Sequence, residues 1–134
     1  MNRSIAKKLS VVALLALSAC SPSAVLKGAD SNQAFVDASQ KLGEPLEIEG
    51  FLAWRSNDYS LYPTKQAWRN SDRRNCLPVL ILAGKSELTD AAERLHGRKV
   101  KLTGVVAPVA PPGMDSVFAC RETGLEVTGI APAG

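Results

Sequence analysis

The chain has few of the side chains on which catalysis and metal binding depend. It holds one histidine and three cysteines in 134 residues, and the cysteines at positions 20, 76 and 120 are too widely spaced for a zinc site. It contains no Cys-x-x-Cys pair, no glycine-rich phosphate loop and no nucleophile motif. We therefore expect neither an enzyme nor a metal or cofactor site, although residues distant in sequence can still assemble a catalytic triad.

The chain also lacks an excess of charge of one sign outside its first residues. It has 16 basic and 13 acidic residues, and Arg3, Lys7 and Lys8 supply the whole difference, because 16 less 3 leaves 13 against 13. A nucleic-acid-binding protein needs a basic face that displaces counterions from phosphates. Because the chain after residue 8 is near neutral, we expect no nucleic acid among its partners.

No hydrophobic run is long enough to form a membrane span. The apolar run Leu9–Ala19 has 11 residues, whereas a transmembrane helix needs roughly 20. A basic start followed by a short apolar run is typical of an export signal. The next four residues, Leu17-Ser18-Ala19-Cys20, resemble the lipobox of bacterial lipoproteins.

This resemblance implies removal of residues 1–19 and attachment of lipid to the thiol of Cys20. The lipid would hold the protein on a membrane of the bacterial envelope, since two or more acyl chains anchor a protein stably. Ser21, in place of an aspartate, implies the outer membrane with the domain facing the periplasm. The alternative is an ordinary secretory signal whose cleavage site happens to precede a cysteine.

The remaining two cysteines, Cys76 and Cys120, predict a disulfide. Once Cys20 carries lipid they form an even pair, and export places them in an oxidising compartment. The alternative is two buried free thiols.

Periodicity predicts a mainly β domain at 34–131. Before it we expect the lipidated Cys20 and a flexible tether at 20–33, and after it a tail at 132–134. The tether's alternative is a first strand or helix. A short helix at 34–42 is compatible with the sequence. The other predicted strands lie at 46–54, 60–62, 77–82, 99–109 and 117–130. Val100, Leu102 and Val106 are expected on one face of the strand at 99–109, and a bend or bulge is expected at 122–124. Helices are predicted at 63–68 and from Ser86, as the N-cap, to Gly97.

Five strands with a helix between the third and the fourth resemble an OB-type barrel. The resemblance includes Gly50 in the first strand, where we expect a bulge or a sharp coil, and the helix-to-strand passage Leu95–Gly104. It implies a small five-stranded OB-like barrel. The chain also resembles small bacterial envelope lipoproteins with a Cys-Leu-Pro segment, here Cys76–Pro78, after an aromatic stretch, a likeness that implies no activity.

All tryptophan and tyrosine side chains fall between positions 54 and 68, interspersed with basic residues. Aromatic and arginine side chains bring a large contact area at a low entropic cost, and ligands of OB-type folds often meet this region. The candidate binding surface comprises Trp54, Arg55, Tyr59, Tyr62, Trp68 and Arg69. Alternatively, the rings belong to the core and the basic residues only solvate its rim.

Other titratable residues have simpler explanations. His96 stands at a predicted helix C-terminus, where a charged imidazole would interact favourably with the helix dipole. Glu47 and Glu49 alternate on the outer face of a strand and are expected to be solvated there, although they could mimic a catalytic carboxylate pair. The sequence thus predicts a non-enzymatic binding module for a protein, peptide or glycan. The alternative is a structural or accessory subunit of an envelope complex.

Overall fold

The structure is a computed structural model that describes residues 25–26, 31–55, 57–110 and 119–134. The predicted signal peptide and Cys20 lie outside these ranges, as does most of the loop expected before the last strand. The elements are β1 (Val25–Leu26), α1 (Ser31–Ser39), β2 (Pro45–Arg55), β3 (Asp58–Tyr62), α2 (Lys65–Arg69), a 3-10 turn (Arg73–Asn75), β4 (Leu77–Leu80), α3 (Ser86–Arg94), β5 (Lys99–Pro108) and β6 (Thr123–Pro132).

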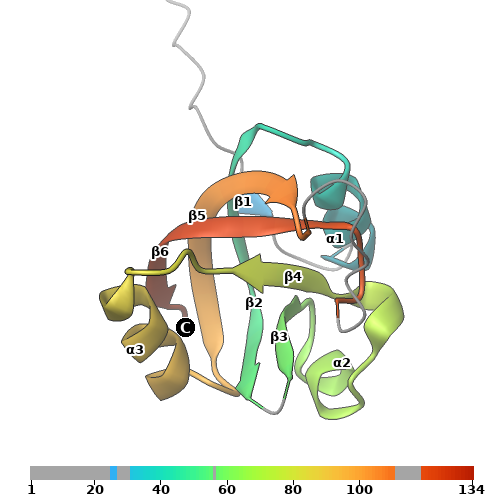
Figure 1. Ribbon diagram of the computed structural model, residues 1–134. Helices are drawn as coiled ribbons and strands as arrows, with labels where there is room; N and C mark the ends of the chain where they lie inside the picture. The colour runs from blue at the N-terminus through green and yellow to red at the C-terminus, as the bar shows by residue number, and fades with distance from the viewer. Residues whose placement is uncertain (1–24, 27–30, 56, 111–118) are drawn as a thin grey trace, which may run out of the picture.

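Five of the strands close into a ring. They follow the order β2-β3-β4-β6-β5, and β5 pairs back onto β2, while β1 adds to the outside of β2 (Figure 1). The β4–β6 pair is parallel, and the other pairs in the ring are antiparallel. The predicted mainly β fold is confirmed, with α3 between the third and fourth strands of the ring.

The ring closes because β2 is shared between two partners. Its residues 45–51 pair with β5, and its residues 51–55 pair with β3. Gly50 lies at this exchange, and a Cβ atom there would approach the carbonyl oxygen of Tyr62 to 2.6 Å. We expected a bulge or a sharp coil at Gly50; instead, β3 passes so close to β2 at this position that a side chain would not fit.

The bulges lie elsewhere than predicted. Pairing continues without interruption through Gly50, which faces Val100. The irregularity in the sheet falls between Thr103 and Gly104 of β5, opposite β6, and not at residues 122–124. A register shift of this kind increases the local twist of a strand pair.

The core fills the ring with alternate residues of its strands. Val100, Leu102 and Val106 are buried on one face of β5, as predicted. Phe35 of α1 and Leu95, just after α3, join the same cluster, so the helices cover openings of the ring. The other members are Ala38, Leu46, Ile48, Leu52, Leu61, Leu77, Val79, Ala92, Leu125 and Val127.

The starts of two helices differ from the prediction: α3 begins one residue earlier and α2 two residues later. α3 begins at Ser86 with Lys85 as the capping residue, so Ser86 is the first helical residue and not the N-cap. α2 begins at Lys65, and its cap is Thr64, whose Oγ1 accepts a hydrogen bond from the backbone N–H of Ala67 at 3.1 Å. A side-chain cap satisfies a backbone donor that the helix leaves free. Thr64 therefore marks the start of α2, and Pro63 lies before the helix.

Both ends of the domain extend beyond the predicted boundaries. β1 pairs in parallel with β2, and α1 begins at Ser31, so part of the predicted tether is a strand and a helix. At the other end β6 continues to Pro132, and the N–H of Ala133 bonds the carbonyl of Lys99 at 2.9 Å. Backbone pairing to β5 holds residues that were predicted to form a tail.

Within the described part of the chain, no helix has both the length and the apolar character that crossing a membrane requires.

Candidate binding site

The aromatic stretch does not form one continuous surface. Tyr62 is fully buried, in a small second cluster with Ala53, Ala67 and Cys76. The prediction that Tyr62 belongs to an exposed surface is therefore wrong, because α2 packs over this part of the hairpin formed by β2 and β3. Trp54 is half-buried against the main core, as the alternative interpretation expects.

Trp54 and Tyr59 are paired across the hairpin. The two residues face each other in the register of β2 and β3, and their ring centroids lie 4.7 Å apart in an edge-to-face arrangement. Aromatic pairs favour this geometry, in which the positive edge of one ring meets the negative face of the other. Tyr59 remains 45% exposed, so this pair presents one ring to solvent.

A hollow of about 450 Å³ opens between the β2–β3 hairpin and α2, and we call it the hairpin hollow. Three residues of the predicted surface meet there, namely Arg55 from β2 and Trp68 and Arg69 from α2. The other residues of its lining come from β2, from β3, from the turn after α2 and from the end of α3. The whole lining is Ala53, Arg55, Asp58, Trp68, Arg69, Ser71 and His96.

Trp68 and His96 form one wall of the hairpin hollow. Their ring centroids are 5.7 Å apart, and the rings meet edge to face. Gly97, with a φ of +80°, turns the chain after α3, and a Cβ atom there would lie 3.0 Å from Cζ2 of Trp68. Glycine at this turn therefore lets the indole pack closely beside His96.

His96 accepts a backbone hydrogen bond instead of acting as a charged partner of the helix dipole. Its Nδ1 receives the backbone N–H of Trp54 at 3.0 Å. Burial, and then the charge of Arg55, lower the pKa of His96, while Asp58 acts in the opposite direction. The predicted role as a charged dipole partner is therefore wrong. A neutral ring that accepts at Nδ1 carries its proton on Nε2, so His96 offers one N–H donor.

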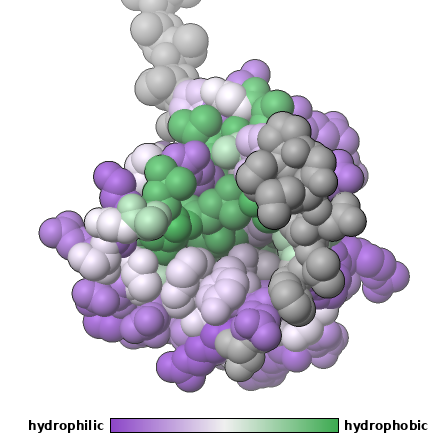
Figure 2. All heavy atoms as spheres, in the orientation of Figure 1, coloured by the Kyte–Doolittle hydropathy of each residue, from purple (hydrophilic) through white to green (hydrophobic). Residues whose placement is uncertain are grey.

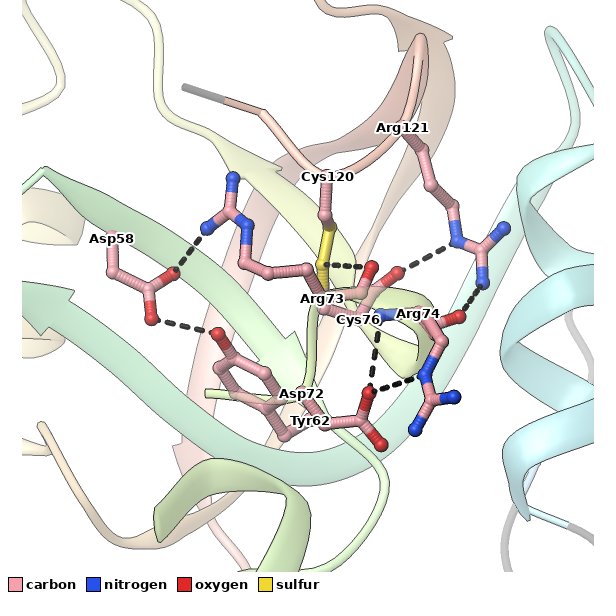
Figure 3. Close-up of a disulfide and its surroundings, with 8 residues drawn as sticks. All are labelled: Asp58, Tyr62, Asp72, Arg73, Arg74, Cys76, Cys120 and Arg121. Carbon is pink, nitrogen blue, oxygen red and sulfur yellow. Dashed lines mark hydrogen bonds and ion pairs between the residues drawn. A yellow bond between two sulfur atoms is a disulfide. The ribbon is translucent and has the colours of Figure 1, made fainter. Parts of the chain in front are cut away.

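Asp58 is held from the interior side of the hairpin. Its Oδ2 accepts a hydrogen bond from the hydroxyl of Tyr62 at 2.7 Å, and its Oδ1 lies 3.7 Å from Nη1 of Arg73 (Figure 3). The second distance is an ion-pair contact and is too long for a hydrogen bond. Burial, with a smaller effect from Asp58, raises the pKa of Tyr62 above its ordinary range. Tyr62 therefore stays protonated and donates to Asp58.

The two arginines of the hairpin hollow are exposed and unpaired within the described residues. Neither Arg55 nor Arg69 makes an ion pair or hydrogen bond there. Asp58, the acidic residue of the lining, already contacts Arg73 and Tyr62. Together with Ser71 and the Nε2–H of His96, the hollow presents more hydrogen-bond donors than acceptors and an excess of positive charge.

The predicted pairing of Cys76 with Cys120 is confirmed, because the structure places the two sulfur atoms at bonding distance. Their Cα atoms lie 6.3 Å apart, within the usual range for disulfides. Arg121 reinforces the link, since its Nε donates to the carbonyl of Cys76 at 2.8 Å and its Nη2 donates to the carbonyl of Arg74 at 2.7 Å (Figure 3). The 3-10 turn that carries Arg73 is thus attached to the segment before β6.

A second hollow, of about 440 Å³, lies beside the start of α3. Its apolar wall includes Leu82, which is 53% exposed, Leu88 and Val127, and its rim is polar. Figure 2 shows hydrophobic side chains gathered on the face of the molecule over β4 and β6. The predicted strand through Leu82 ends at Leu80, and this early end leaves Leu82 in the exposed loop before α3.

Glu47, one of the two acidic residues of β2, forms an ion pair across the sheet. Glu47 and Glu49 are half-buried on the outer face of the strand, and Oε1 of Glu47 lies 3.0 Å from Nζ of Lys101 on β5. The hydrogen bond to Glu47, with its negative charge, raises the pKa of Lys101. Glu47 and Lys101 thus form a cross-strand ion pair on the outer face of the sheet.

Sequence reasoning missed Ala53 and three polar residues of the hairpin hollow. Asp58 begins β3 and Ser71 stands in the turn after α2, both without a motif, and His96 was assigned to the helix end next to which it lies. Within the described residues no cluster of His, Cys, Asp or Glu could hold a metal ion.

No protein family matches the chain, and no curated protein matches it in sequence. What the hollow binds therefore has to follow from its own side chains.

Proposed function

We propose that this protein is a lipid-anchored, non-enzymatic binding module of the bacterial envelope. Cys20 carries the lipid, and the domain faces the periplasm, where it binds a protein, peptide or glycan in the hairpin hollow. The observation that supports this proposal most strongly is that Arg55 and Arg69 lie in one hollow with the indole of Trp68 and that neither side chain has a partner among the described residues. Arginine and tryptophan are the residues most enriched where binding energy concentrates.

The size and shape of the hairpin hollow suit recognition better than chemistry. Ligand sites usually have volumes of about 300 to 1,000 Å³ and a few converging polar groups, and the hollow has about 450 Å³. His96, the histidine of the lining, uses Nδ1 to accept a backbone hydrogen bond. It therefore has no free basic nitrogen with which to take a proton from a substrate, and this supports a binding role.

The proposal is tested by photo-crosslinking in living cells. A photoreactive amino acid replaces Lys65, which lies one helical turn before Arg69 on the same face of α2. The control position is Thr103, an exposed residue of β5 that does not line the hollow. We expect a discrete crosslinked product from position 65 that is absent from position 103. Identical patterns at the two positions, or no product from position 65, would contradict the proposal.

The alternative is that the protein is a structural or accessory subunit of an envelope complex. The apolar side chains over β4 and β6, with Leu82 exposed, support this alternative (Figure 2), because exposed apolar patches often mark protein interfaces. A photoreactive residue at position 82 separates the two functions. Crosslinked products from position 82 without products from position 65 would contradict the binding module and support the accessory subunit.

A further inference from the structure

We infer that the hairpin hollow binds the carboxylate of a glutamate or aspartate side chain in a peptide segment, between the guanidinium groups of Arg55 and Arg69. The inference rests on the proposed function and specifies the chemistry of its ligand.

Donors exceed acceptors among the side chains of the hollow. Arg55, Arg69 and the Nε2–H of His96 only donate, and the hydroxyl of Ser71 can donate or accept. Asp58 already accepts from Tyr62 and contacts Arg73. A ligand that fills this hollow must therefore bring acceptors. A carboxylate supplies two acceptor oxygens and a negative charge, and arginine binds it through two parallel hydrogen bonds.

The wall of the hollow beside the arginines is held in place. Trp68 lies in α2, which Thr64 caps, and the ring of His96 is fixed by the N–H of Trp54. Arg55 is close enough to His96 for its charge to lower the pKa of the imidazole. A negative ligand beside Arg55 would offset that positive charge, so the charge distribution of the hollow is complementary to an anion.

The aromatic side chains favour a peptide over a glycan. Sugar rings stack on exposed aromatic faces, but the indole of Trp68 is half-buried and packs beside His96 and Gly97. Tyr59, whose ring is the most exposed, does not line the hollow. The hollow therefore offers charge and hydrogen bonds without a broad stacking surface, as an acidic peptide requires.

The test uses the full chain, purified in detergent micelles and labelled with nitrogen-15. The probes are two libraries of pentapeptides, acetylated and amidated at their ends, with glutamate or glutamine at the central position and mixed neutral residues elsewhere. The chain has two tryptophans, so it has two indole N–H signals. Trp68 lines the hollow and Trp54 does not, and Trp54 therefore serves as an internal control.

We expect the glutamate library to shift the indole signal of Trp68 and the glutamine library to leave it unchanged. Arg55→Gln and Arg69→Gln should each weaken the apparent affinity about tenfold, which corresponds to about 1.4 kcal/mol. The matched control is Arg94→Gln, because Arg94 is exposed on α3 and lies outside the lining. Equal shifts with both libraries, or equal effects of the three substitutions, would overturn the inference.

The inference and the proposed function can fail separately. If neither library shifts the Trp68 signal but position 65 still yields a crosslinked partner, the carboxylate inference is wrong and the binding module stands. If position 65 yields no product either, both are wrong. An oligogalacturonate is a glycan that carries carboxylates. If it shifts the Trp68 signal and the glutamate library does not, the ligand is an acidic glycan, and the inference of a peptide is wrong.

Discussion

At the scale of single residues, Asp58 connects the hairpin hollow to the interior. It lines the hollow, while its carboxylate contacts the hydroxyl of buried Tyr62 and the guanidinium of Arg73. The Oδ1 atom is buried and has no hydrogen-bond partner within the described residues. The hydrogen bond from Tyr62 to Oδ2 is therefore important for the stability of this carboxylate in the fold.

Tyr62→Phe tests that contact. Removing the hydroxyl leaves Oδ2 of Asp58 without its donor, and a hydrogen bond to a charged group contributes about 1.5 to 3 kcal/mol. We expect the free energy of unfolding in urea to fall by this amount. Tyr59→Phe is the matched control, because the ring of Tyr59 is 45% exposed, and it should change stability little. Equal effects of the two substitutions would show that the contact with Asp58 contributes nothing.

His96 makes stability depend on pH. Its pKa in the folded protein lies below the ordinary 6.5, so below about that pH the unfolded chain binds more protons than the folded chain. His96 therefore stabilises the fold fully above its ordinary pKa, and this contribution is lost as the pH falls. We expect the urea midpoint to decrease between about pH 7.5 and about pH 5.5, and to decrease less in His96→Gln.

Other titrating groups contribute equally to both proteins in that experiment, so the comparison isolates His96. A midpoint that rises as the pH falls in the wild type alone would mean that the imidazole is charged in the fold, as its predicted role at the helix end required.

At the scale of elements, the shared strand β2 decides how the ring closes. Gly50 lies where its partner changes from β5 to β3, and a side chain there would meet the backbone of Tyr62. A close approach of two backbones is one reason for glycine within a strand.

Gly50→Ala should destabilise the domain by about 1 to 3 kcal/mol, the usual cost of forcing extra volume into a packed core. Gly129→Ala is the matched control in β6, because a Cβ atom there would meet its nearest neighbour at an ordinary 3.7 Å. Urea unfolding of both variants measures the difference. If Gly50→Ala were tolerated as well as Gly129→Ala, the close packing of β2 on β3 would be refuted.

The disulfide is the second link between elements. It joins residues 44 positions apart in sequence, and closing a loop of that length stabilises a fold by about 4 kcal/mol in a model that counts only unfolded-state entropy. Replacing both Cys76 and Cys120 by alanine should lower the free energy of unfolding by an amount of this order. Reduction should raise the mass of the wild type by two hydrogens, and alkylation of both thiols without a reductant would contradict the pairing.

At the scale of the whole molecule, sequence patterns predicted elements better than their contacts. The alternation of Val100, Leu102 and Val106 was enough to place β5, and the spacing of Ala92 and Leu95 was enough to place α3, because each pattern is local. The bulge at Thr103 and the extension of β6 to Pro132 depend on pairing between distant strands, and no local signal predicted them.

The hairpin hollow shows the same limit. Arg55, Trp68 and Arg69 stood out because they are close in sequence and rich in binding chemistry. His96 lines the hollow because the turn at Gly97 places the end of α3 against Trp68. Tyr62 is buried and not exposed, because α2 covers it. Both outcomes follow from tertiary packing, which composition does not encode.

The central claim is that a lipid on Cys20 holds this domain in the envelope, and intact mass spectrometry of the protein from a membrane fraction tests it most directly. We predict a chain that begins at Cys20 and carries the added mass of acyl chains, located by fragmentation on that residue. A chain with an unmodified sulfur at position 20, or one that still contains residues 1–19, would contradict the claim.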